Sequence, residues 1–254
     1  MRTTNANLRS TPKQVLPSDM KIPMTIRQQG LWYLTEAERD VRAAYNVVLA
    51  LDTSAPLDAP VLARAIDALA QRHPLLFARV VSEDGLAAFE TLEPAGVAAV
   101  TVVDGDVNEV ASRESGEPVD VERGPLLRAV IVRDGSRSGL VMTFAHIAFD
   151  GASVPILLSE LCVAYDAVVV GAAPSFGSMP MAPDALCARE RAFVRSDAGR
   201  RATSEAAERL RGLPASIELP RTGARVAGTV PRAEQVETML PAQQVAEIRE
   251  FCSG

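Results

Sequence analysis

LVMTFAHIAFDG, residues 140–151, is the stretch from which the fold can be inferred. Its first five residues are an almost uninterrupted apolar run, which is typical of a buried strand. His146, one of only two histidines in the chain, follows one residue after this run, and an Asp-Gly pair ends the stretch. A histidine on the loop that ends a strand is often chemical, whereas a buried histidine is usually structural. The stretch therefore predicts a strand that presents an imidazole at its end.

The loop after this strand contains two residues that we expect to support it. Gly151 should allow a turn that a Cβ atom would hinder. Asp150 should hold the loop by hydrogen bonds or by an ion pair with an arginine, for which Arg72 is one candidate. An imidazole held in this way could take a proton from an alcohol or amine. A structural histidine with satisfied hydrogen bonds is the alternative interpretation of His146.

The remaining sequence alternates between helical and strand patterns. One amphipathic helix over residues 57–74 has Asp58 as a candidate N-cap and Pro60 in its first turn. The other expected helices cover residues 24–34, 153–170, 184–196 and 240–251, and the expected strands cover 43–51, 76–81, 97–103, 126–132 and 140–145. Interleaved elements of this kind indicate an α/β or α+β fold, with a mixed sheet flanked by helices.

Composition excludes several classes of function. The net charge of −6 and the aromatic content of 4% argue against nucleic-acid binding, which needs basic surfaces and stacking side chains. The three cysteines, Cys162, Cys187 and Cys252, are too few and too scattered for a zinc site or a disulfide framework. Residues 1–23 are polar and irregular and are expected to form a flexible leader. Neither a signal peptide nor a membrane span is expected, so the predicted location is cytoplasmic.

Several ordered blocks resemble the condensation-domain superfamily, which is related to chloramphenicol acetyltransferase and the carrier-linked acyltransferases. Residues 145–165 resemble its HHxxxDG motif, with His146 at the second histidine. In residues 25–34, the opening S-x-A-Q-x-R-L-W motif is matched by Thr25, Gln28, Leu31 and Trp32. Residues 44–81, 182–193 and 210–223 are similar to the segment around R-H-E-x-L-R-T-x-F and to two later blocks.

The resemblance implies a chloramphenicol-acetyltransferase-like lobe over residues 24–254, with a second lobe supplied by the same or another chain. Between the lobes, a tunnel would receive an acyl or peptidyl thioester on the phosphopantetheine arm of a carrier protein. His146 would position or deprotonate an amine or hydroxyl acceptor, with Asp150 structural. Ala145, Ser153 and Trp32 are candidates for the tunnel wall. No metal, directly bound cofactor, nucleic acid or membrane is implied.

Departures from the family motifs leave other functions open. Ala145 replaces the first motif histidine, and Phe77 replaces the second arginine of R-H-E-x-L-R-T. Pro74, Gly30 and Ala206 stand where a glutamate, an arginine and a tryptophan are expected. The sequence therefore predicts a condensation enzyme of nonribosomal peptide biosynthesis with a degenerate motif. A non-catalytic recruitment module and a free-standing acyl-CoA-dependent transferase are the alternatives.

Overall fold

The chain divides into two compact units, Met1–Leu213 and Pro214–Gly254. The computed structural model describes residues 21–93, 100–135, 137–214 and 238–253 of them. The expectation that residues 24–254 form one lobe stays a prediction. In the described part of the second unit, α7 (Ala242–Ser253) buries none of its residues.

A four-stranded sheet forms the centre of the first unit. Its strand order is β2 (Asn46–Thr53), β7 (Arg137–Ala145), β6 (Leu127–Asp134) and β5 (Val100–Asp104). The first three strands pair antiparallel, whereas β5 runs parallel to β6. The intervening helix α3 (Val107–Gly116) provides the crossover that a parallel pair needs.

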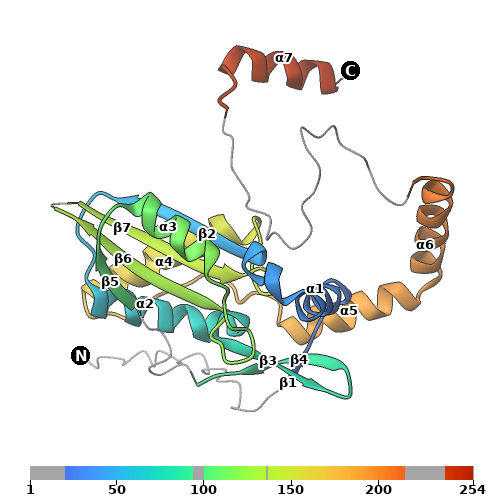
Figure 1. The fold of residues 1–254 in the computed structure, drawn as a ribbon, viewed down its shortest axis with the longest axis horizontal. Coiled ribbons are helices and arrows are strands. Elements are labelled where there is room, and N and C mark those ends of the chain that lie inside the picture. The colour runs from blue at the N-terminus through green and yellow to red at the C-terminus, as the bar shows by residue number, and fades with distance from the viewer. Residues whose placement is uncertain (1–20, 94–99, 136, 215–237, 254) are drawn as a thin grey trace, which may run out of the picture. The chain divides into compact units, whose positions relative to one another are not determined.

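Helices cover both faces of this sheet (Figure 1). On one face, α2 (Ala59–Arg72) and α4 (Ser153–Val169) share a core with Met142 and Phe144 of β7. On the other face, α3 packs through Val110 against Val141 of the same strand. The prediction that residues 140–145 form a central strand is therefore confirmed, since β7 is buried on both faces.

A second, three-stranded sheet has the order β1 (Lys21–Pro23), β4 (Leu86–Thr91) and β3 (Ala78–Glu83). Residues 21–23 were expected in a flexible leader, but Ile22 is only 1% exposed and lies opposite Phe89 in β4. A three-residue strand is too short to give a recognisable pattern. Residues 1–20 of the expected leader lie outside the described residues.

The remaining helices of the first unit are α1 (Ile26–Ala37), α5 (Pro183–Arg195) and α6 (Asp197–Leu210). Short 3-10 helices cover Arg39–Tyr45 and Pro74–Phe77. Helices α1, α2, α4, α5 and α7 and strands β2, β3, β5, β6 and β7 agree with the expected elements, apart from end residues. Asp58 caps α2 as expected, because its Oδ1 accepts the Val61 N–H at 2.9 Å. Strands β1 and β4 and helices α3 and α6 were not expected from the sequence.

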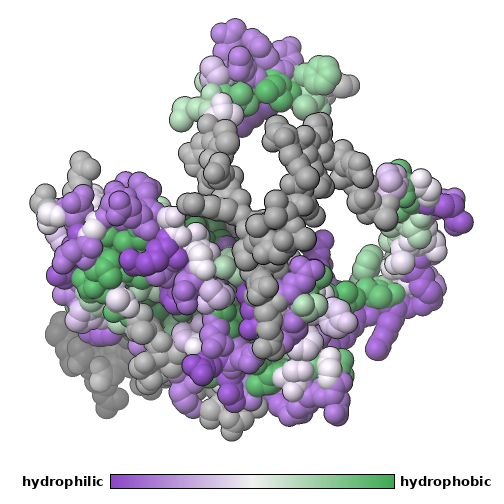
Figure 2. Space-filling view, in the orientation of Figure 1, coloured by the Kyte–Doolittle hydropathy of each residue, from purple (hydrophilic) through white to green (hydrophobic). Residues whose placement is uncertain are grey.

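Some helices carry apolar side chains that are exposed to solvent. In the second unit, Figure 2 shows apolar surface along one side of α7, where Ile248 and Phe251 are exposed. Monomeric proteins limit such patches, so an apolar helix side is a candidate contact surface. Within the described residues, no helix has the length and hydropathy needed to cross a membrane.

A substitution at Gly139 tests how closely α3 packs against the central strand β7. A Cβ atom at this buried position would overlap the Val107 side chain and lie 3.2 Å from the Leu51 carbonyl oxygen. Gly139→Ala should therefore lower the free energy of unfolding by about 1–3 kcal/mol, as overpacking does. Gly30 of α1 is the control, because a Cβ atom there meets no atom within 4 Å. Gly30→Ala should raise the free energy of unfolding by about 0.5–1 kcal/mol, since alanine is favoured over glycine inside a helix. Urea unfolding of both variants measures the difference, and equal stabilities would contradict the packing described.

Candidate functional site

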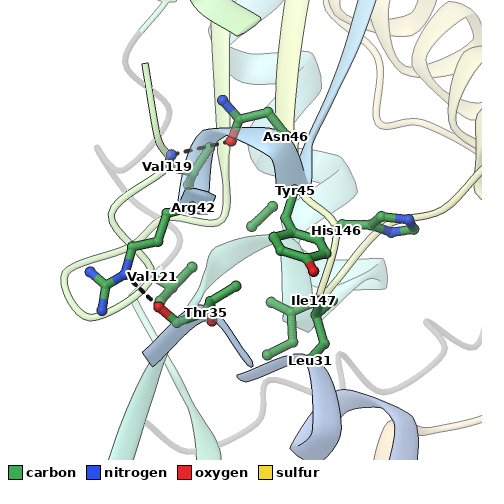
Figure 3. Close-up of a pocket in the computed structure, with 10 residues that line it drawn as sticks. Leu31, Thr35, Arg42, Tyr45, Asn46, Val119, Val121, His146 and Ile147 are labelled. Atoms are coloured by element: carbon green, nitrogen blue, oxygen red, sulfur yellow. Dashed lines mark hydrogen bonds between the residues drawn. The ribbon is translucent and has the colours of Figure 1, made fainter. Parts of the chain in front are cut away.

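His146 is the first residue after β7, and its side chain is exposed. The backbone N–H of His146 donates to the Tyr45 carbonyl oxygen at 2.9 Å, which fixes the start of the loop beside β2. Figure 3 shows the imidazole pointing away from Arg42, Thr35 and Val121. The imidazole therefore lies at the surface, directly after the central strand, as expected from the sequence.

One hydrogen bond determines which ring nitrogen of His146 carries the proton. Nδ1 lies 2.9 Å from the Phe149 carbonyl oxygen. A carbonyl oxygen can only accept, so Nδ1 must be the donor. In the neutral imidazole, Nε2 then holds the lone pair and can accept a proton from a bound molecule. The ring is therefore oriented in the way that a general base requires.

Asp150 supports the end of the same loop. Its Oδ1 accepts the Ser153 hydroxyl at 2.7 Å and the Ser153 backbone N–H at 3.0 Å, next to the start of α4. The Ser153 hydroxyl is the main cause that lowers the pKa of Asp150 below its ordinary value. Slight burial opposes this lowering, whereas the backbone N–H groups of Ser153 and Ala152, and the positive charge of His146 when it is protonated, add to it. Asp150 therefore binds its own loop, which is one of the two arrangements expected from the sequence.

Gly151 does not have the role that the sequence analysis expected. A Cβ atom built at this position meets nothing within 4 Å, and the backbone is not in the left-handed region that favours glycine. The loop therefore turns without a conformation that only glycine can adopt. Its shape comes from the hydrogen bonds of Asp150 and His146 instead.

Arg72 binds a different carboxylate from the one expected. Its Nε donates to Glu160 of α4 at 2.7 Å, and its terminal nitrogens donate to the Ser178 carbonyl at 2.5 Å and the Gly177 carbonyl at 3.4 Å. Burial raises the pKa of Glu160, but hydrogen bonds from His73 and Arg72 outweigh burial and lower it overall. Arg72 therefore joins α2 to α4 and to the segment after α4, rather than pairing with Asp150.

Gln28 is a further support of the loop, and the sequence analysis noted it only as a motif match. Its Nε2 donates to the Ile147 carbonyl oxygen at 2.9 Å. The sequence signal that could have found it was the capping-box spacing of Thr25 and Gln28 at the start of α1. Tyr45 and Phe149 contact the His146 loop through their backbone carbonyls, which every residue type has. The identity of these residues in the sequence therefore could not reveal the contacts.

A small pocket lies beside the loop, on the side away from the imidazole (Figure 3). Its cavity volume of about 30 Å³ suits one or two water molecules rather than a substrate. The lining residues are Leu31, Thr35, Arg42, Tyr45, Asn46, Val119, Val121, Ala145, His146 and Ile147.

Among the residues expected in a tunnel wall, Ala145 lines this pocket. Trp32 is half-buried against the core cluster of the second sheet, and Ser153 binds Asp150. In the ranges described, no three His, Cys, Asp or Glu side chains gather as a metal site would require.

The Asp150 contact gives a test of stability against pH. Asp150→Ala should lower the free energy of unfolding by about 1 kcal/mol at pH 7, as loss of a capping side chain does. Because the folded pKa is depressed, the ionised group stabilises the fold above about pH 3.9, the ordinary value. This contribution is lost as the pH falls through the lowered folded pKa, so the difference from wild type should shrink there.

Urea unfolding over a range of pH measures this effect, with Ser153→Ala as the matched background. In that background, Asp150→Ala should cost less, because the shared hydrogen bond is already absent. An unchanged stability combined with lost turnover would instead assign Asp150 to the chemistry.

Comparison with known proteins identifies the family. A family model described as Condensation domain matches residues 18–254. A linear gramicidin synthase protein of Brevibacillus parabrevis is 26% identical over 253 residues, which are 95% of this chain and 3% of that protein. Phosphinothricin tripeptide synthetase PhsB of Streptomyces viridochromogenes is 29% identical over 236 residues, which are 86% of this chain and 19% of that protein. The chain therefore spans less than a fifth of either relative.

Solved structures show the same fold. The X-domain from teicoplanin biosynthesis matches with a TM-score of 0.71 and 21% identity, over 85% of this chain and 49% of that one. The first condensation domain of the calcium-dependent antibiotic synthetase matches with a TM-score of 0.68 and 21% identity, over 77% and 48%. The epimerization domain of tyrocidine synthetase B matches with a TM-score of 0.66 and 16% identity, over 82% and 49%. These matches confirm the expected chloramphenicol-acetyltransferase-like α/β lobe, at about half the length of each solved chain. From residue 18 to residue 254, the chain belongs to the condensation-domain family.

Proposed function

We propose that this chain is the first lobe of an enzyme that joins a carrier-bound acyl or peptidyl thioester to an amine or hydroxyl acceptor in nonribosomal peptide biosynthesis. The observation that carries the proposal is the contact between Nδ1 of His146 and the Phe149 carbonyl, since it leaves Nε2 unprotonated on an exposed imidazole. The family match and the synthetase names of the relatives support the reaction class.

In the proposed reaction, Nε2 of His146 accepts the proton of the acceptor N–H or O–H as this group attacks the thioester carbonyl. The tetrahedral intermediate carries a negative oxygen, which backbone N–H groups of the loop help to stabilise. The C–S bond then breaks, and the imidazolium returns its proton to the departing thiolate. The products are an amide or ester and the free thiol of the carrier arm, so atoms and charges balance.

The proposal requires two partners. One is a carrier protein, whose phosphopantetheine arm brings the thioester as a substrate group. The other is a second lobe, on the same or another chain, because the pocket of about 30 Å³ cannot enclose the reactants. Water must be kept from the thioester, and a second wall would do this. We place the reaction in the cytoplasm, where free thiols such as those of the three cysteines are the usual state.

A recruitment module without catalysis is the second candidate. Phe77, at the position of a motif arginine, is 2% exposed and belongs to the apolar core. Ala145, at the position of the first motif histidine, is also buried. Neither side chain has a polar group to offer to the loop. A family member that has lost polar groups at two motif positions could keep a docking role alone.

His146→Ala distinguishes the two candidates in the complete protein. Single-turnover condensation with a loaded carrier should slow by roughly 10²–10⁴, the range for loss of a positioned proton-transfer group. The affinity for the carrier protein should stay nearly unchanged, since the carrier is expected to dock outside the reactive site. His73→Gln is the matched control, because the other histidine contacts Glu160 and the glutamine amide can still donate there. This control should remain within a few-fold of wild type.

Two outcomes would contradict the catalytic proposal. In one, wild type forms no product with any amine or alcohol acceptor but still binds a carrier or partner enzyme, which favours the recruitment module. In the other, His146→Ala reacts as fast as His73→Gln, which removes the proposed role of Nε2.

A further inference from the structure

Gln28 connects the start of α1 to the His146 loop through an amide whose orientation is determined. Its Oε1 accepts the Thr25 backbone N–H at 2.9 Å and the Thr25 hydroxyl at 3.0 Å. The Gln28 backbone N–H donates in turn to the Thr25 hydroxyl at 3.3 Å, which completes a capping box. Because Oε1 is used by the cap, Nε2 is the end of the amide that faces the loop.

The group that Nε2 binds is the carbonyl of Ile147, the residue next to His146. The Ile147 side chain is 7% exposed and lies in the same core cluster that Leu31 and Trp32 of α1 pack against. Helix α1 therefore holds this residue by a polar contact on its backbone and an apolar contact on its side chain. Two residues further on, the Phe149 carbonyl accepts from the imidazole.

We propose that Gln28 is a positioning residue for His146. By fixing the Ile147 carbonyl, it fixes the path of the loop to Phe149 and hence the contact that keeps the proton on Nδ1. Loss of the Gln28 donor should let the loop move and allow the imidazole to carry its proton on either nitrogen. The catalytic consequence rests on the proposed function, but the effect on the ring itself does not.

Gln29 provides a matched control on the same helix. Its Nε2 also donates to a backbone carbonyl, that of Ala87 in β4, at 2.7 Å. Both side chains are partly buried, and both bonds join α1 to another element. Only the Gln28 bond reaches the His146 loop. A general loosening of α1 would therefore follow from either change, whereas a specific effect on His146 follows from one.

The test is nitrogen NMR of the 254-residue chain labelled with ¹⁵N-histidine. The chain has two histidines, so His73→Gln identifies the ring signals of His146. Gln28→Glu keeps an acceptor for the Thr25 cap but removes the donor to Ile147. We expect the His146 ring nitrogens to change from the pattern of a single Nδ1-protonated form to that of a mixture. Gln29→Glu should leave them as in wild type, and the His73 signals should report an intact fold in both.

Unchanged His146 signals in Gln28→Glu would overturn the inference, as would the same change in Gln29→Glu. If the charge of the new carboxylate disrupts folding, the uncharged Gln28→Met variant tests the same lost donor. In the complete enzyme, Gln28→Met should slow single-turnover condensation by roughly 10- to 100-fold with KM retained, which is the cost of a misplaced reactive group. A wild type without turnover would refute the proposed function but leave the NMR result to decide this one.

Discussion

The hydrogen bond from Nδ1 of His146 to the Phe149 carbonyl is the contact on which the proposed chemistry of this lobe depends. It requires a tight loop, and the loop requires fixed ends. Strand β7 fixes one end, because it is buried on both faces of the sheet. Asp150 and Ser153 fix the other end at the start of α4. The sheet and its helices thus hold one exposed imidazole whose Nε2 has no hydrogen-bond partner among the described residues.

Sequence patterns were informative where they reflected burial and capping. The apolar run of residues 140–144 predicted a central strand, and Asp58 before Pro60 predicted the start of α2, because both signals are local. The role of Gly151 was predicted wrongly, since a glycine in a sequence does not reveal its backbone angles. The partner of Arg72 could not be predicted either. Glu160 is 88 residues away in the chain, and only the packing of α2 against α4 brings them together.

The fold alone does not determine the reaction. Solved structures with similar TM-scores include condensation domains, an epimerization domain and an X-domain, so function depends on the residues placed at the site. In this chain, Ala145 stands where the resemblance to the family motif implies a first histidine, and its small side chain borders the pocket behind the loop. His146 is held largely by hydrogen bonds to the backbone carbonyls of Tyr45 and Phe149. Side-chain substitutions at other positions do not remove these carbonyl groups. The apolar side chains of Ala145 and Phe77 are therefore compatible with the observed orientation of His146.

The most direct measurement is a structure of the complete protein with a non-reactive amine acceptor analogue bound. The account predicts that the acceptor nitrogen lies within about 3 Å of Nε2 of His146, as a general base requires, while Nδ1 keeps its contact with the Phe149 carbonyl. An acceptor bound away from His146, or an imidazole turned so that Nε2 faces the Phe149 carbonyl, would contradict it.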